Sequence, residues 1–84
     1  MYTFLVVDDE SLVRENIVFL LRQSSHYPFH ILEAEDGDTA MDMLAVQSVD
    51  VLLLDVRMLR VSGLQLMEWL HDKNWEGIYA VISG

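Results

Sequence analysis

The segment VLLLD at residues 51–55 is a continuous apolar run that ends in a single acidic residue. A strand with one face in water alternates apolar and polar residues, whereas a strand covered on both faces is apolar throughout. We therefore expect residues 51–54 to form a strand of a parallel sheet with helices on both faces, and Asp55 to lie where that strand ends.

Outward from this segment, strand-like and helix-like patterns alternate along the chain. The strand candidates are short and rich in β-branched and aromatic residues. The helix candidates repeat apolar residues at helical spacing and begin near residues that can cap them. The expected strands are residues 2–7, 29–34, 51–54 and 78–82, and the expected helices are residues 11–23, 37–47 and 64–72. This βαβαβαβ order predicts an α/β fold with a doubly wound parallel sheet.

The chain has 84 residues, of which 52% are hydrophobic and 23% charged, a composition typical of one small globular domain. The apolar content exceeds what so short a chain is expected to enclose, so we expect a piece of a larger protein. No apolar run approaches the ~20 residues of a membrane helix, and no signal peptide pattern is present. Cysteine is absent, which excludes disulfides and thiolate metal sites and is compatible with a cytoplasmic protein.

The charge is strongly one-sided, because 5 Lys and Arg stand against 14 Asp and Glu for a net charge of −9. Such a segment repels phosphate backbones, so we expect it not to bind nucleic acid directly. The acidity favours a cation, a cationic partner surface, or simply a solvated exterior. The histidines at 26, 30 and 71 share no spacing and are interpreted as surface or packing residues.

Four polar residues follow the expected strands: Asp8 and Asp9 after the first, Asp55 after the third and Ser83 after the fourth. Ligands of open parallel sheets bind beyond the carboxyl ends of the strands. If the first and third strands are neighbours, the three carboxylates converge and repel one another, and a divalent cation would relieve that repulsion. Oxygen ligands with no His or Cys nearby favour a hard ion, and Mg²⁺ fits best.

Each of these acidic residues also has an ordinary structural interpretation. Asp before a helix is a common cap, and Asp after a strand is a common turn residue. Only their joint placement at strand ends of one α/β sheet favours a functional site.

The chain resembles the receiver domain of bacterial two-component response regulators over its whole length. The residues that carry the resemblance are LVVDDE at 5–10, LLLDVRM at 52–58, the Gly63-Leu64 helix entry and VISG at 81–84. The resemblance implies a flavodoxin-like sheet with strand order 2-1-3-4. It also implies that residues 1–84 form a single receiver-like domain that is incomplete at its C-terminus, lacking the family's fifth strand and last helices.

The same resemblance assigns roles to individual residues. Asp55 would be the phosphoacceptor, and Ser83 would contact a phosphoryl oxygen and shift on activation. Asp9 would ligate Mg²⁺ directly, Asp8 mainly through water, and the backbone carbonyl of Arg57 would be a further ligand. The family transfers a phosphoryl group to itself rather than acting as a classical enzyme. Its partners are a sensor histidine kinase and a C-terminal effector domain outside this chain, often one that binds DNA.

Two departures from the family pattern have consequences. Leu59 stands where the family usually has Pro, and the Lys at the end of the fifth strand lies beyond the chain. Without that Lys, we expect weak Mg²⁺ binding and slow or absent phosphorylation. Without the fifth strand, residues 78–82 would present an open edge that favours self-association.

Three other classes remain for comparison. A non-catalytic receiver-like interaction module would keep the fold without using phosphate, and the loss of the Lys leaves this alternative open. A haloacid-dehalogenase-like phosphatase would need a second Asp where Arg57 stands. A flavodoxin-like cofactor binder would need a phosphate-binding loop rich in Ser, Thr or Gly after the first strand. Arg57 and Arg60 are interpreted by default as solvated side chains, with control of access to Asp55 as the alternative.

Overall fold

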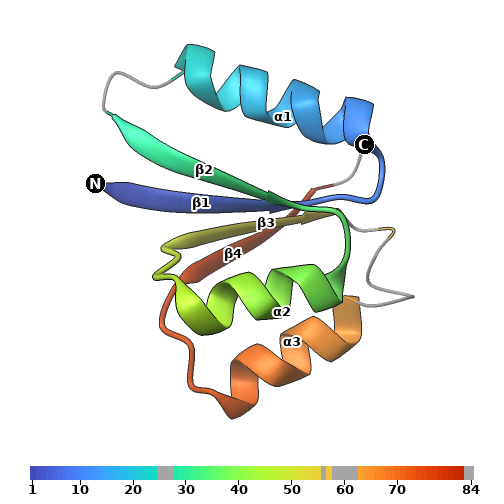
Figure 1. The fold of residues 1–84 in the computed structure, drawn as a ribbon, viewed down its shortest axis with the longest axis vertical. Coiled ribbons are helices and arrows are strands. Elements are labelled where there is room, and N and C mark those ends of the chain that lie inside the picture. The colour runs from blue at the N-terminus through green and yellow to red at the C-terminus, as the bar shows by residue number, and fades with distance from the viewer. Residues whose placement is uncertain (25–27, 56, 58–62, 83–84) are drawn as a thin grey trace.

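The computed structural model describes residues 1–24, 28–55, 57 and 63–82. The strands and helices alternate along the chain as expected, and each boundary lies close to the one that the sequence pattern predicts (Figure 1). The elements are β1 (Tyr2–Val7), α1 (Ser11–Ser24), β2 (Phe29–Ala34), α2 (Gly37–Val46), β3 (Val51–Asp55), α3 (Gly63–Asp72) and β4 (Ile78–Ile82).

The four strands form one parallel sheet in the order β2-β1-β3-β4. This order confirms the α/β fold and the 2-1-3-4 sheet that the sequence predicts. It also places β1 and β3 side by side at the centre, so that the acidic residues at their carboxyl ends share one edge of the sheet.

Asp50 helps to fix the register at the opposite edge. Its side chain accepts the Thr3 backbone N–H at 2.8 Å, and its backbone N–H donates to the Thr3 carbonyl at 2.9 Å. Its own carbonyl accepts the Ile78 N–H at 2.9 Å. One residue therefore links β1, β3 and β4 where these strands begin.

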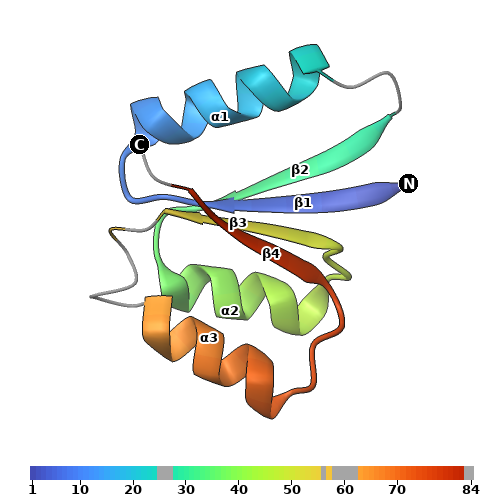
Figure 2. The same ribbon diagram turned by 180° about the vertical axis from the view of Figure 1, so that it is seen from behind.

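Helices cover both faces of the sheet, with α1 on one face and α2 and α3 together on the other (Figures 1 and 2). The main hydrophobic core lies between the sheet and the α2/α3 layer. Its buried members are Leu5, Val7, Ala34, Ala40, Val49, Leu52, Leu54, Leu66 and Leu70. The apolar run of β3 thus supplies two side chains to this core, as expected of a covered central strand.

The face beneath α1 is less completely covered. No residue of α1 is buried, and Leu20, one of its apolar residues, is 61% exposed. The half-buried face of the helix instead includes Arg14 and Val18 together with Ile17 and Leu21, so Leu20 lies beyond its edge. The packing direction was not fixed by apolar spacing alone, because the apolar stripe of α1 is wider than the contact it makes.

Strand β4 forms an edge of the sheet within the described residues. It pairs with β3, and four of its five residues are exposed, including Ile78 at 70% and Tyr79 at 53%. The expected open edge at residues 78–82 is therefore present in the described part of the chain. None of the helices in the described ranges is long and apolar enough to cross a membrane.

Candidate functional site

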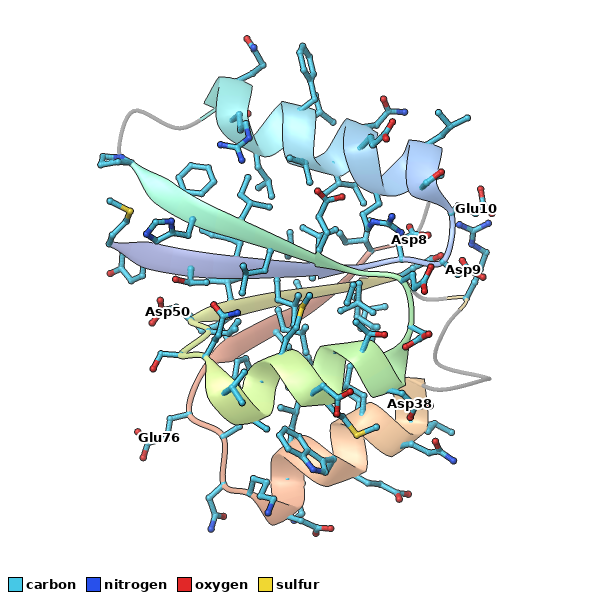
Figure 3. All side chains as sticks on the ribbon, in the orientation of Figure 1. Asp8, Asp9, Glu10, Asp38, Asp50 and Glu76 are labelled. Carbon is cyan, nitrogen blue, oxygen red and sulfur yellow. The ribbon has the colours of Figure 1, made fainter. Side chains whose placement is uncertain are left out.

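The acidic cluster predicted from the sequence is formed at the carboxyl edge of the sheet. Val7 pairs with Leu54 in the β1–β3 ladder, so the next residues, Asp8 just after β1 and Asp55 at the end of β3, lie at neighbouring strand ends. Carboxylate oxygens of Asp8, Asp9 and Asp55 all lie within 4.8 Å of one another. Figure 3 shows Asp8, Asp9 and Glu10 at this end, whereas Asp50 and Glu76 lie at the other end.

Two of these carboxylates are buried. Asp8 is 1% exposed and Asp55 4% exposed, whereas Asp9 is open to solvent. Burial raises the pKa of Asp8, because its charged form is removed from water, and the nearby Asp55 carboxylate raises the pKa further. A hydrogen bond from the Glu10 N–H to Asp8 Oδ1 at 2.9 Å acts in the opposite direction. The hydrogen bond from Glu10 therefore offsets only part of the cost of keeping the buried Asp8 carboxylate charged.

The Arg57 side chain lies among these carboxylates. Its Nε donates to Asp55 Oδ2 at 2.9 Å, and its Nη2 lies 2.8 Å from the same oxygen. Its Nη1 donates to Glu10 Oε1, and its Nη2 lies 4.0 Å from Asp8 Oδ1. The bonds to Asp55 and Glu10 raise the pKa of the guanidinium, which stays charged. This position corrects the default interpretation of Arg57 as a solvated side chain.

A second arginine supports the loop that carries Asp8. Arg14 Nη1 donates to the Asp8 carbonyl at 2.6 Å, and its Nε donates to Glu33 Oε1 at 3.1 Å. The Asp8 N–H in turn donates to the Ala34 carbonyl at 3.1 Å. Arg14 thus joins the start of α1 to the ends of β1 and β2. Glu33 of β2 is its partner.

The remaining sequence predictions have different outcomes. Ser83, Leu59 and Arg60 lie outside the described residues. The Arg57 carbonyl stays a predicted ligand, while its backbone N–H donates to Asp55 Oδ1 at 3.2 Å. The sequence pattern did not predict the role of Arg14, and it offered a role for Arg57 near Asp55 only as the alternative to solvation. A signal was present for Arg57, because a residue two positions beyond Asp55 is close enough to reach back to it.

The donor set suits a hard divalent cation. The three residues offer only carboxylate oxygens, two of them from buried side chains whose charges repel each other. Such a cation would compensate the buried charge, and the exposed Asp9 leaves room for retained water, which Mg²⁺ prefers to keep. The residues present therefore fit the magnesium site that the sequence predicts.

Comparison with known proteins decides the family. Residues 4–84 match the family described as response regulator receiver domain. The chain belongs to this family. The α/β sheet with order β2-β1-β3-β4 is thus a receiver fold, and the cluster at its carboxyl edge is the acidic cluster of a receiver.

Curated relatives of this receiver include two bacterial response regulators. It is 42% identical over 68 residues to the response regulator MprA of Mycobacterium avium, covering 81% of this chain and 28% of that protein. It is 41% identical over 66 residues to the phosphate regulon transcriptional regulatory protein PhoB of Klebsiella pneumoniae, covering 79% of this chain and 28% of that protein. The receiver therefore spans little more than a quarter of the curated relatives it matches.

Among solved structures, the receiver is similar to the response regulator TrrA of Thermotoga maritima, crystallised with Mg²⁺ and a beryllium fluoride. The two share 28% identity and a TM-score of 0.83, over 99% of this chain and 70% of that one. TrrA was also crystallised with the histidine kinase ThkA, and that structure matches with a TM-score of 0.81, 27% identity, and coverage of 100% and 70%.

Proposed function

We propose that this receiver accepts a phosphoryl group from the phosphohistidine of a sensor histidine kinase onto Asp55, with Mg²⁺ bound at the acidic cluster. The observation that carries the proposal is the convergence of Asp55 with Asp8 and Asp9 at one edge of the sheet. The crystal structures of TrrA with Mg²⁺ and a beryllium fluoride, and with a histidine kinase, support it by similarity.

The proposed roles follow from the positions of the side chains. Asp9 is exposed and would ligate Mg²⁺ directly, as would Asp55, whereas Asp8 is buried and would act mainly through water. The Arg57 carbonyl would complete the protein ligands. Bound Mg²⁺ would offset negative charge on the transferring group and on the carboxylates. Asp55 attacks phosphorus in line, a P–O bond forms as the P–N bond to histidine breaks, and the released imidazole takes up a proton.

The response to phosphorylation would involve residues near the C-terminal end of β4. The phosphoryl group adds about −1.5 to −2 charge, enough to bias a local two-state equilibrium. In the proposal, the Ser83 hydroxyl contacts a phosphoryl oxygen and carries the change onward. Residues 1–84 act as one receiver unit in this scheme, without binding nucleic acid directly.

The wider setting is proposed from the relatives. The name of PhoB, a transcriptional regulatory protein, points to a transcriptional regulator as the parent protein, with an effector domain, often a DNA-binding one, that follows the receiver. A cytoplasmic location fits transfer from a kinase to such a regulator. The open edge of β4 would make the 84-residue chain self-associate.

A non-catalytic interaction module is the second candidate, and one observation favours it. Arg57 donates hydrogen bonds to both oxygens of Asp55, from its side chain and its backbone, so the acceptor carboxylate already has partners within the chain. A module of this kind would keep the fold and its partners without phosphate transfer.

Labelling of Asp55 tests the proposal. The chain is incubated with Mg²⁺ and phosphoramidate, and separately with Mg²⁺ and beryllium fluoride while its thermal stability is followed. We expect slow, base-labile labelling and a fluoride-dependent rise in melting temperature. Both should disappear in Asp55→Asn and persist in Asp42→Asn, an exposed carboxylate of α2. The absence of both signals in the unaltered chain would favour the interaction module.

A further inference from the structure

The guanidinium of Arg57 compensates part of the negative charge of the acidic cluster. One oxygen of Asp55 accepts from its side chain at 2.9 Å, and the other accepts from its backbone N–H at 3.2 Å. The same group binds Glu10 and lies 4.0 Å from Asp8. A single permanently charged side chain thus faces three of the carboxylates at this edge.

We propose that the Arg57 side chain is a built-in counter-ion that competes with the divalent cation for the carboxylate pocket and keeps the cation affinity of this receiver low. This inference rests on the proposed function, because it requires the same carboxylates to bind the cation.

Competition follows from the limited number of acceptor atoms. A cation held by both Asp8 and Asp55 needs an oxygen of Asp55, and both oxygens already accept hydrogen bonds from Arg57. Two positive charges held a few ångströms apart also repel each other. Because a guanidinium does not lose its proton, it must move away for the cation to enter.

The surroundings of Arg57 allow that movement. Its side chain is 50% exposed, and its outer partner Glu10 is 52% exposed. Asp55, at 4% exposed, is the inner partner. The guanidinium can therefore leave Asp55 and remain paired with Glu10 at the surface, without displacing any residue of the core.

The coupling must act in both directions. If Arg57 hinders the cation, the cation hinders the Arg57–Asp55 contact by the same factor. Without Arg57, the buried carboxylates of Asp8 and Asp55 would face each other uncompensated in the metal-free protein. Removing Arg57 should therefore raise affinity for the cation and lower the stability of the metal-free form.

Calorimetric titration with MgCl₂ tests this inference. Arg57→Met keeps much of the apolar stem of the side chain and the backbone carbonyl while removing the charge, and we expect it to bind Mg²⁺ roughly fivefold or more tightly than the unaltered chain. Arg57→Lys keeps the charge, so its affinity for Mg²⁺ should be closer to that of the unaltered chain. Arg22→Met, at the last turn of α1, makes the same change in net charge away from the pocket and should leave the affinity unchanged.

Thermal melting in EDTA and in Mg²⁺ gives a second measurement. Arg57→Met should melt at a lower temperature than the unaltered chain in EDTA. Addition of Mg²⁺ should raise its melting temperature by more than that of the unaltered chain. If it is unfolded in EDTA, Mg²⁺-induced refolding followed by circular dichroism supplies its affinity. Equal or weaker binding by Arg57→Met than by Arg22→Met would overturn the inference and leave the proposed function intact. If no form bound Mg²⁺, the proposed cation site would fail, and the inference with it.

Discussion

Val7 of β1 lies directly beside Leu54 of β3 in the parallel ladder. Both side chains are buried in the core beneath α2 and α3, so the two strands cannot slip past each other without exposing apolar surface. The residues that follow them, Asp8 just after β1 and Asp55 at the end of β3, consequently lie at the same edge of the sheet. Core packing on one side of the sheet thus sets the spacing of the carboxylates at its edge.

Asp8→Asn should stabilise the metal-free protein while abolishing cation binding. Asparagine can still accept the Glu10 N–H, but it removes a buried charge whose pKa is raised by burial and by Asp55. We expect a gain of about 0.5–2 kcal/mol in free energy of unfolding, measured by urea denaturation in EDTA. The matched control is Asp9→Asn, exposed in the same cluster, which should change stability by less than about 0.5 kcal/mol.

The pH dependence of this effect has a definite sign. The pKa of Asp8 is raised above 3.8, its ordinary value, so the folded protein holds this proton more tightly than the unfolded chain. The stabilisation that comes from this raised pKa is fully present below pH 3.8 and is lost as the pH rises through the pKa that Asp8 has in the folded protein. The advantage of Asp8→Asn should therefore grow as the pH rises from 3.8 through the pKa of the folded protein. A constant difference across this range would contradict the assignment.

Leu66→Ala should be among the more destabilising substitutions in α3. Leu66 is fully buried in the core, whereas Leu64 of the same helix is 61% exposed. Truncating a buried leucine removes apolar contacts and leaves a cavity, so we expect a loss of about 2–5 kcal/mol in free energy of unfolding. Leu64→Ala is the control and should change it by less than about 0.5 kcal/mol. Similar losses in both variants would contradict the packing of α3 described above.

Arg14→Met should destabilise the loop that carries Asp8. The substitution removes the hydrogen bond to the Asp8 carbonyl and the contact with Glu33 while keeping much of the apolar stem. A hydrogen bond from a charged donor contributes about 1.5–3 kcal/mol, and the partial exposure of this one favours the lower end. The control Arg22→Met removes the same charge from the other end of α1. Equal melting temperatures of the two variants would show that the contact with Asp8 contributes little to the stability of the fold.

Asp36→Ala should weaken the start of α2, especially near neutral pH. The Asp36 side chain accepts the Thr39 backbone N–H at 2.7 Å, and this bond lowers the pKa of the carboxyl. The stabilisation is therefore present above the ordinary carboxyl pKa and is lost as the pH falls through the lower, folded value. The difference in melting temperature between the unaltered chain and Asp36→Ala should shrink on acidification, whereas Asp42→Ala, in the middle of α2, should show no such trend.

Ile78→Lys should reduce self-association of the chain. Ile78 lies on the exposed edge strand β4, where a lysine disfavours pairing with a second strand. Light scattering at increasing concentration should detect assemblies of the unaltered chain and fewer of this variant. Leu12→Lys adds the same charge at an equally exposed position on α1 and should leave association unchanged. A monomeric unaltered chain would refute the expectation.

The sequence alone determined the strands and helices, because each depends on a local pattern that the chain carries itself. The apolar run before Asp55 predicted a covered strand, and the acidic residues after it and after β1 marked the carboxyl ends where a ligand would bind. The sheet order came from resemblance to a family, and the structure confirms it.

Only the tertiary structure decided where the long charged side chains go. Arg57 reaches Glu10 across 47 residues of sequence, and Arg14 reaches Glu33 across 19. The position of a long arginine side chain depends on all the carboxylates and backbone oxygens around it. These acceptors come together only when β1, β2 and β3 lie side by side. The sequence of α1 likewise did not show which part of its wide apolar stripe faces the sheet, because that depends on how the helix packs on the sheet beneath it.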